Sequence, residues 1–268
     1  MKITIITVVL NNEKTIRDTI ESVLNQTYKN IEYIIVDGYS TDNTMNIINE
    51  YKDKIDLITQ EHPKGVFDSL NKGIELATGD VIGFIHSDDF YLDNLVIQRV
   101  FDEFQNKKVD SIFADLLYIK NDNLNKAIRY YSAKHFTPKK VTYGIIPPHP
   151  TFFVKSSIYK KYGLYKTDYK VAGDYEMFVR LLYINKISYS YINLPIIKMR
   201  IGGLSTGGLK SKLYNNKEVL KSLRDNGVKT NYFVITKKYP IKILEIIKGS
   251  LYNALVAKKK LLKKIRKK

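Results

Sequence analysis

Short apolar runs alternate with amphipathic segments along the first 115 residues of the chain. The runs have the length of buried strands, and the segments between them place apolar residues at helical spacing, as Ile16, Ile20 and Val23 show. The predicted strands cover residues 3–9, 31–36, 55–59, 80–86 and 109–114, and the predicted helices cover residues 14–25, 41–51, 66–77 and 92–104. This alternation predicts an α/β fold with a Rossmann-like, mostly parallel sheet and helices on both faces.

The pattern becomes less regular after residue 115. The sequence predicts a β-hairpin over residues 116–132 and a proline-rich loop over 135–150. Two helices are predicted over 156–162 and 174–184, and two strands over 187–192 and 196–200. A glycine-rich hinge is predicted over 202–208. Further helices follow, the last from about residue 241 to the end. We therefore expect a main domain over residues 1–205, with halves at 1–115 and 116–205, and a C-terminal helical extension over 206–268.

The formal net charge of +17 is concentrated at the C-terminal end. Residues 237–268 contain twelve Lys or Arg and one acid, whereas the other 236 residues carry 32 basic and 26 acidic side chains. A nucleic acid is therefore not an expected partner of the main domain. The chain has no Cys, which excludes disulfides, Cys-ligated zinc and thiol nucleophiles.

The opening apolar run predicts a buried strand rather than a signal peptide. It spans about eight residues and is followed by Asn11-Asn12-Glu13, not by small residues suited to cleavage. No stretch approaches the ~20 apolar residues that cross a bilayer. We therefore expect the protein to stay on the side of the membrane where it is made, which is the cytoplasm.

Polar side chains gather where the predicted strands end. Right-handed crossovers bring the carboxyl ends of parallel strands to one rim of the sheet, where ligands bind. The residues predicted there, or at a helix start on the same rim, are Asn11, Glu13, Asp37, Asp68, Asp88 and Asp89. The first strand is not followed by the G-x-G-x-x-G of a dinucleotide-binding fold.

Each of the Asp residues among them, taken alone, also has a structural explanation. Asp37 can be a turn former, and Asp68 with Lys72 can be an exposed ion pair on one helix. Asp88 and Asp89 can be part of an ordinary loop, but adjacent acids after a buried strand repel unless a cation compensates them. Mg²⁺ or Mn²⁺ held by one or two carboxylates and by phosphate oxygens is the functional alternative.

Longer motifs make the chain resemble the family 2 glycosyltransferases of the GT-A fold. The motifs in the first 90 residues are TVVLNN, LNQTYKNIEYIIVDGYSTDNT and GVFDSLNKGIELATGDVIGFIHSDD, and PPHPTFFVKSSIYKKYGLY and VAGDYEMFVRLL follow later. The resemblance covers roughly residues 1–205. It implies an inverting transfer from a nucleotide-sugar, usually a UDP-sugar, with the help of a divalent metal. It also makes residues 1–115 the donor-binding half and 116–205 the acceptor-side half.

The resemblance also assigns roles to individual residues. Those expected to bind the nucleotide-sugar are Thr7, Asn11, Glu13, Asp37, Asp68, Asn71, Lys72 and Asp88. Of these, Thr7, Asn11 and Asp37 resemble contacts to the base and ribose, and Asp88 is expected to face the ribose or sugar. Asp89 stands at the metal position, and Asp174 occupies the place of the catalytic base.

The sequence departs from the family pattern before Asn71. Many relatives have Arg there, but this chain has Leu70, so neutralisation of the diphosphate would depend more on the metal, Lys72 or Arg200. His149 is the histidine best placed by motif to be a third metal ligand, although a packed or acceptor-contacting role is favoured.

Asp174 has a structural alternative as well. It starts an amphipathic segment and could be only a helix N-cap. Glu176 nearby could support it or face solvent.

A transfer reaction needs stabilisation of the diphosphate leaving group, which a metal at Asp89 would give, and a base for the acceptor hydroxyl, which Asp174 would be. One alternative is a nucleotidyltransferase, but that class wants a glycine- and arginine-rich loop where this chain has LNNEK. The other is an inactive nucleotide-sugar-binding protein. The joint presence of five Asp residues speaks against it, namely Asp37, Asp68, Asp88, Asp89 and Asp174.

The C-terminal tail predicts an amphipathic helix. Its apolar residues recur at helical spacing among many lysines, at Leu244, Ile247, Leu251, Leu255, Leu262 and Ile265. One interpretation is a helix packed on the main domain with a solvated basic end. The other is a helix that lies on an anionic membrane and holds the enzyme at its inner face. The second interpretation suits a glycan or lipid-linked glycan acceptor, as in the assembly of surface polysaccharides such as capsule or lipopolysaccharide.

Overall fold

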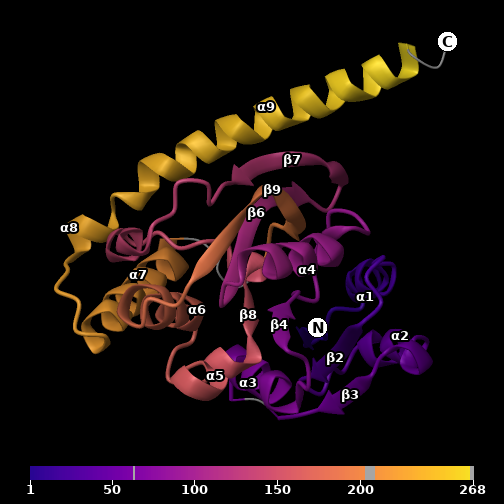
Figure 1. The fold of residues 1–268 in the computed structure, drawn as a ribbon, viewed down its shortest axis with the longest axis horizontal. Coiled ribbons are helices and arrows are strands. Elements are labelled where there is room, and N and C mark those ends of the chain that lie inside the picture. The colour runs from indigo at the N-terminus through magenta and orange to yellow at the C-terminus, as the bar shows by residue number, and fades with distance from the viewer. Residues whose placement is uncertain (63, 203–208, 266–268) are drawn as a thin grey trace.

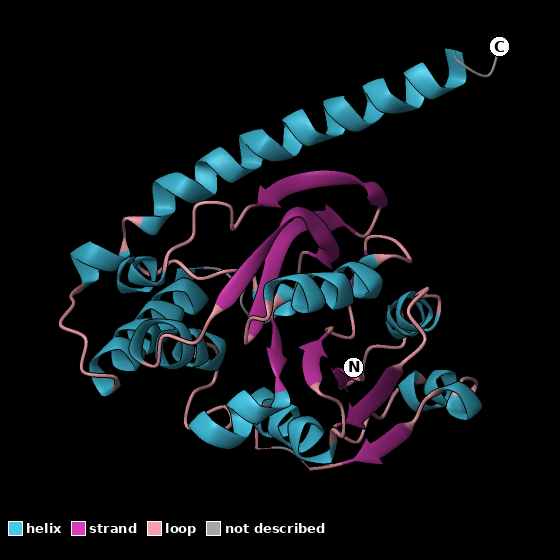
Figure 2. Ribbon diagram, in the orientation of Figure 1, coloured by secondary structure: helices cyan, strands magenta, loops and turns pink. Residues whose placement is uncertain are grey.

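The computed structural model describes residues 1–62, 64–202 and 209–265, with side chains described to residue 258 except at 209, 210 and 212. One mixed sheet of nine strands runs through it, in the order β3-β2-β1-β4-β8-β6-β9-β5, with β7 paired to β6 (Figures 1 and 2). The strands are β1 Ile3–Val9, β2 Ile31–Asp37, β3 Leu57–Gln60, β4 Val81–Phe84, β5 Phe90–Tyr91, β6 Ser111–Lys120, β7 Asn123–Tyr131, β8 Phe153–Lys155 and β9 Tyr189–Arg200.

Helices cover both faces of this sheet. They are α1 Ile16–Leu24, α2 Thr44–Asn49, α3 Val66–Leu76, α4 Val96–Lys107, α5 Ser156–Tyr162, α6 Gly173–Phe178, α7 Leu209–Asp225, α8 Tyr232–Ile235 and α9 Lys238–Ile265. Short helical turns lie at Lys52–Lys54, Pro138–Tyr143 and His149–Thr151, and a π-helical turn, Val179–Ile184, continues α6. None of the described helices is long and apolar enough to cross a membrane.

The first four strands are parallel, as the sequence predicts. Neighbouring positions on β1 face opposite sides of the sheet because strand side chains alternate. Ile6 therefore joins one core, together with α3, α5, α6 and α7, while Ile5 joins the other, together with α1, α2 and α4. Gly73 brings α3 close to β1, since a Cβ there would lie 2.5 Å from the Ile6 side chain. The predicted α/β class with helices on both faces is confirmed.

The sheet departs from a simple Rossmann order at β8. This three-residue strand lies antiparallel between β4 and β6, in the residues between the predicted proline-rich loop and the predicted helix at 156–162. Gly83 on β4 makes room for it, because a Cβ there would meet the ring of Phe153 on β8 at 2.3 Å. A strand this short leaves almost no periodic pattern in the sequence.

Two pairs of predicted segments merge into single long strands. Residues 109–114 and the first arm of the predicted hairpin form β6, and residues 187–192 and 196–200 form β9. The register between them shifts near Pro195, where Ala114 pairs with Ile192 and Asp115 with Pro195. A bulge lets the strand continue through the proline, which cannot donate a ladder hydrogen bond.

The extension after residue 205 packs against the main domain. Val219, Leu220 and Leu223 of α7 belong to the same core as α6. The long helix α9 runs along the outer strand β7 at the edge of the molecule (Figure 1). The predicted glycine-rich hinge lies at residues 203–208, outside the described residues, apart from Gly202.

Candidate active site

The turns after β1 and β2 are locked together at the rim. Asp37 ends β2 fully buried, and its carboxylate accepts hydrogen bonds from Ser40 N (3.0 Å), Ser40 Oγ (2.5 Å) and Gln60 Nε2 (2.9 Å). Asn11 adopts a left-handed conformation with φ 52°, which asparagine tolerates. Its Oδ1 accepts from Thr41 N at 2.8 Å. Asn11 and Asp37 are therefore linked through the neighbouring residues Ser40 and Thr41.

Two other predicted nucleotide contacts, Thr7 and Glu13, are engaged elsewhere in the fold. Thr7 is fully buried, and its hydroxyl shares a hydrogen bond of 3.1 Å with the hydroxyl of Tyr33 inside the sheet. It presents no polar atom to the rim. Glu13 is exposed, and its Oε2 accepts from Asn43 N at 3.0 Å, so it stabilises the start of α2.

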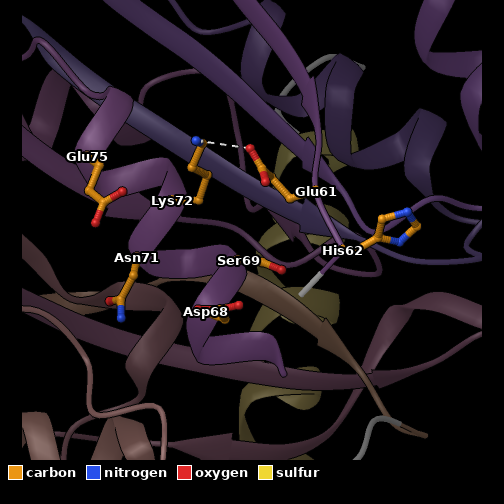
Figure 3. A pocket seen from close by; sticks show the side chains of 7 residues that line it. All are labelled: Glu61, His62, Asp68, Ser69, Asn71, Lys72 and Glu75. Atoms are coloured by element: carbon orange, nitrogen blue, oxygen red, sulfur yellow. Dashed lines mark ion pairs between the residues drawn. The ribbon is translucent and has the colours of Figure 1, made fainter. Parts of the chain in front are cut away.

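A polar hollow of about 180 Å³ lies beside the start of α3 (Figure 3). Its lining residues are Glu61, His62, Asp68, Ser69, Asn71, Lys72 and Glu75. Lys72 points across it to Glu61, 3.0 Å away, so much of the charge that could neutralise a diphosphate is already paired. Asp68 accepts a hydrogen bond from Lys64 N at 3.1 Å at the beginning of the helix.

Asn71 is a structural clamp in this arrangement. Its side chain both donates to Tyr165 O and accepts from Tyr165 N, each at 2.8 Å, and so joins α3 to the loop before α6. The hydroxyl of Tyr165 in turn meets His149 Nε2 at 2.7 Å.

His149 is buried and stacks on Phe84, with ring centroids 5.6 Å apart. Burial, followed by the neighbouring His86, lowers the pKa of His149 to about 3. Because its Nε2 is bonded to Tyr165 and its ring stacks on Phe84, the geometry favours the packed role of His149 over a metal ligand.

The two acids after β4 lie in very different surroundings. Asp89 is fully buried, its Oδ1 accepts from Arg200 N at 3.1 Å, and its Oδ2 has no hydrogen-bond partner among the described residues. Burial, and then the charge of Asp88, raises the pKa of Asp89 well above its usual range. Asp88 is half-buried, and its main-chain oxygen accepts a hydrogen bond from the Arg200 guanidinium at 2.6 Å. The carboxylate of Asp88 takes no part in that bond. Asp88 is thus the more accessible of the two carboxylates, while Asp89, the residue expected to meet the metal, has one buried oxygen without a partner.

Arg200 is a structural residue of this turn. It is almost fully buried, and its guanidinium forms an ion pair with Asp18 on α1 as well as the bond to Asp88 O. Its charge therefore ties the Asp88-Asp89 turn to α1 and is not open to a diphosphate.

The donor groups at the turn fit a divalent cation bound together with a diphosphate. No cluster of three His, Asp or Glu side chains that could hold an ion by themselves occurs in the described part of the chain. Mg²⁺ and Mn²⁺ are commonly held by one or two carboxylates plus substrate phosphate oxygens. The accessible carboxylate of Asp88 and the unpartnered oxygen of Asp89 supply that minimal set.

Asp174 lies near the start of α6, on the same side of the sheet as α3. Gly173 before it packs so closely on Phe67 of α3 that a Cβ would approach the ring to 2.7 Å. The N-cap position belongs to Ala172, so Asp174 is not the cap that its sequence context allows. Its Oδ1 accepts from Tyr175 N at 2.7 Å. Burial raises the pKa of Asp174 to about 6.

Glu176 is committed to structure and is not a second candidate base. It is fully buried and holds Arg180 through bonds of 3.0 and 3.2 Å from Nε, with Lys166 Nζ at 3.2 Å. Arg180 also donates to the carbonyls of Gly163 (3.0 Å) and Leu164 (2.7 Å). The pair therefore shapes the loop that leads to Asp174.

Sequence reasoning missed Glu218 on α7. Its carboxylate accepts hydrogen bonds of 2.8 Å from the main-chain N–H groups of Lys170, Val171 and Ala172, the residues just before α6. Burial alone would raise the pKa of Glu218, but these three bonds together with one from Tyr214 outweigh it and lower the pKa. Glu218 thus holds the segment that carries Asp174. No local pattern could identify it, because its partners lie 46–48 residues away.

Comparison with known proteins points to one family. The family model for glycosyl transferase family 2 matches residues 4–163. The chain is 29% identical over 241 residues to the UDP-Glc:α-D-GlcNAc-diphosphoundecaprenol β-1,3-glucosyltransferase WfaP of Escherichia coli, covering 88% of this chain and 91% of WfaP. It is 32% identical over 135 residues to WfgD, which has the same activity name in the same species, covering half of each chain.

Solved structures share the fold at low identity. TarS of S. aureus in complex with UDP-GlcNAc matches with a TM-score of 0.67 and 19% identity, over 84% of this chain and 65% of that one. A mannosyltransferase from Pyrobaculum calidifontis in complex with GDP-Man and Mn²⁺ matches with a TM-score of 0.62 and 16% identity, over 94% and 69%. Both likenesses concern the fold alone.

Proposed function

The chain belongs to glycosyl transferase family 2 and is a glycosyltransferase of the GT-A fold, and from that premise we propose that it transfers a sugar, with inversion, from a UDP-sugar to a hydroxyl of a lipid-linked glycan. The observation that carries the proposal is Asp174, a half-buried carboxylate with a pKa of about 6, at the start of a helix that packs on α3. A group with that pKa is ionised at neutral pH and can still accept a proton.

The side chains divide the work of the reaction. Asn11 and Asp37, tied together at the rim, bind the nucleoside end of the donor. Asp88 faces the diphosphate, where a bound Mg²⁺ or Mn²⁺ would neutralise the charge that grows on the leaving group. Asp174 takes the proton of the acceptor hydroxyl as that hydroxyl attacks the anomeric carbon from the face opposite the diphosphate.

The relatives support the choice of donor and acceptor. WfaP and WfgD are named for transfer from UDP-Glc to a sugar on diphosphoundecaprenol, and TarS was solved with UDP-GlcNAc. An acceptor on a lipid diphosphate would place this enzyme in the assembly of cell-surface polysaccharide, at the inner face of the cell membrane. The GDP-Man in the mannosyltransferase structure makes GDP-sugars the donors to compare.

A panel of UDP- and GDP-sugars tests the proposal. We expect the purified protein to hydrolyse one UDP-sugar slowly, to transfer it faster when a lipid-linked acceptor is added, and to lose both activities in excess EDTA. Full activity in EDTA would exclude the metal, and failure to turn over any donor of the panel with Mn²⁺ present would favour an inactive binding protein.

Two conservative variants separate the roles of the adjacent acids. Asp88→Asn removes the accessible carboxylate, so Mn²⁺ binding in the presence of UDP should weaken at least about tenfold, and turnover should fall by about 10²-fold or more. Asp89→Asn keeps an acceptor for Arg200 N and should weaken Mn²⁺ binding less. Titration calorimetry measures the Mn²⁺ affinity of both variants. If Asp89→Asn binds Mn²⁺ more weakly than Asp88→Asn, the metal is held by Asp89 instead.

A further inference from the structure

The long helix α9 turns its polar face toward the protein and its apolar face away from it. Against β7, Asn253 donates to Ala127 O (2.7 Å) and accepts from Ala127 N (2.9 Å), while Glu245 pairs with Arg129 at 2.5 Å. Gly249 touches the β7 backbone, where a Cβ would lie 2.9 Å from Arg129 Cα. These contacts use small or polar residues. Tyr252 and Val256 are half-buried, and Tyr252 also meets Tyr130 of β7, with ring centroids 5.6 Å apart.

The outward face of α9, defined as Ile243, Leu244, Ile247, Leu251 and Leu255, is solvent-exposed. The exposed fractions of these side chains lie between 54% and 63%. A helix that covers a globular core normally shows the opposite arrangement, with its apolar stripe inward. A row of exposed large apolar side chains along one helix marks a binding surface.

We propose that the outward face of α9 docks into the headgroup region of an anionic membrane. The helix would then lie in the plane of the membrane, with its apolar side chains at the boundary between headgroups and acyl chains and its lysines on lipid phosphates. Membrane docking goes beyond the proposed transfer reaction. It rests on that reaction only for its biological role, which is to bring the enzyme to a membrane-held acceptor.

The distribution of charge selects an anionic surface as the occupant. Residues 237–268 contain twelve Lys or Arg and one acid. That acid, Glu245, is buried and paired with Arg129, so it offers no negative charge to an incoming surface. Lys248 and Lys258 are exposed beside the apolar stripe. Each basic residue near an anionic membrane strengthens binding by roughly fivefold.

A second copy of the chain is the less suitable occupant. Pairing two outward faces would bring together two C-terminal segments, residues 237–268 of each copy, with a formal charge of +11 each and no accessible acid between them. Like charges at that spacing repel, and the repulsion would have to be overcome by five exposed side chains per helix. A membrane with anionic lipids has the complementary charge and an apolar layer under it.

The test compares vesicle binding of the intact chain and of two variants. In Ile247→Ser/Leu251→Ser/Leu255→Ser the charges and the face toward β7 are unchanged. The control is Leu213→Ser on α7, because Leu213 and Leu251 are equally exposed, at 59%. Cosedimentation is measured with phosphatidylglycerol–phosphatidylcholine vesicles and with phosphatidylcholine vesicles alone.

We expect the intact chain and the control to bind the anionic vesicles at low salt and to be released in part by high salt. The triple variant should bind at least about tenfold more weakly, while its UDP-sugar hydrolysis in solution is unchanged. No binding of the intact chain, or equal binding to both kinds of vesicle, would overturn the proposal. So would a dimer in sedimentation velocity that the triple variant, but not the control, converts to monomer. Loss of hydrolysis in every protein would instead count against the proposed function.

Discussion

The chemistry proposed for Asp174 depends on how much of its carboxylate is shielded from water. The side chain is half-buried, and that burial raises its pKa to about 6, while the hydrogen bond from Tyr175 N acts in the opposite direction. A carboxylate with an ordinary pKa near 4 would be a weaker base, and one with a pKa far above 7 would be protonated and inert. Burial and the opposing hydrogen bond together give an intermediate value.

Substitution of this carboxylate should remove the base and leave the donor site intact. For Asp174→Asn we expect transfer to fall by about 10²–10⁴-fold with donor KM nearly unchanged. The wild-type kcat should rise with pH through about 6, because the ionised carboxylate is the active form, and the variant should lack that rise. Initial rates across pH 5–8 measure both. Asp168→Asn, an exposed acid paired with Lys221, is the control and should keep the wild-type profile.

The same substitution should change the stability of the protein in a predictable direction. Because the folded-state pKa of Asp174 lies above its ordinary value, the folded protein binds more protons than the unfolded chain between about pH 4 and 6. The free energy of unfolding therefore falls as pH rises through this window. Asp174→Asn does not ionise and should be more stable than wild type at pH 8 by about 1–3 kcal/mol. Equal urea midpoints at pH 8 would contradict the raised pKa.

At the scale of elements, α7 controls the segment in front of α6. Glu218 binds three consecutive main-chain N–H groups of that segment, and charge-assisted hydrogen bonds of this kind are among the stronger ones in proteins. The residues it holds run directly into Gly173 and Asp174. The negative charge of Glu218 also contributes to the raised pKa of Asp174. Glu218 is therefore a positioning residue for the base.

Replacing this charge should alter the titration of the base as well as the stability of the loop. In Glu218→Gln the midpoint of the kcat–pH profile should move to lower pH, because a negative charge that opposes ionisation of Asp174 is gone. We expect kcat to fall by about 10-fold with donor KM unchanged. The free energy of unfolding should fall by about 1–3 kcal/mol. Lys217→Gln, the exposed neighbour on α7, is the control. An unshifted midpoint would reduce Glu218 to a purely structural role.

At the scale of the whole molecule, α9 packs the C-terminal end of the chain along β7 at the edge of the molecule. One face of this helix is used by β7, and the other carries the exposed apolar stripe, so the two interpretations that the sequence left open are compatible. Removing residues 238–268 would uncover β7 and take away Glu245 from the partly buried Arg129. It would also remove Lys238, which is buried and bonded to Asn216. Point substitutions on either face are therefore cleaner tests than truncation.

The packing of α9 on β7 can be broken at its narrowest point. Gly249→Val places a branched side chain against the Arg129 backbone, where even a Cβ lies 2.9 Å away, so the helix must move off the strand. We expect the free energy of unfolding to fall by about 1–3 kcal/mol and trypsin to cleave α9 faster. Ser250→Val introduces the same side chain at an exposed position of the helix and should have little effect. Equal cleavage of the two variants would show that α9 is not held there.

The sequence by itself determined the local elements and the edge of the sheet where chemistry takes place. Apolar runs and helical spacing predict the first four strands and the helices between them because those patterns repeat within a few residues. Asp37, Asp88 and Asp174 follow or begin such elements, so their placement near element ends was predictable, and the motifs around them indicated the family. The same spacing predicted an amphipathic tail.

Only the tertiary structure decided what each side chain meets. Nothing near Asp88 and Asp89 in the sequence shows that Arg200, more than a hundred residues later, encloses one and leaves the other accessible. Three other features depend in the same way on residues far apart in the sequence. They are the insertion of β8 beside β4, the hydrogen bonds of Glu218 to the segment before α6, and the exposure of the apolar face of α9. Burial and hydrogen bonding depend on surfaces brought together by the whole chain, and local periodicity carries no record of which surface that is.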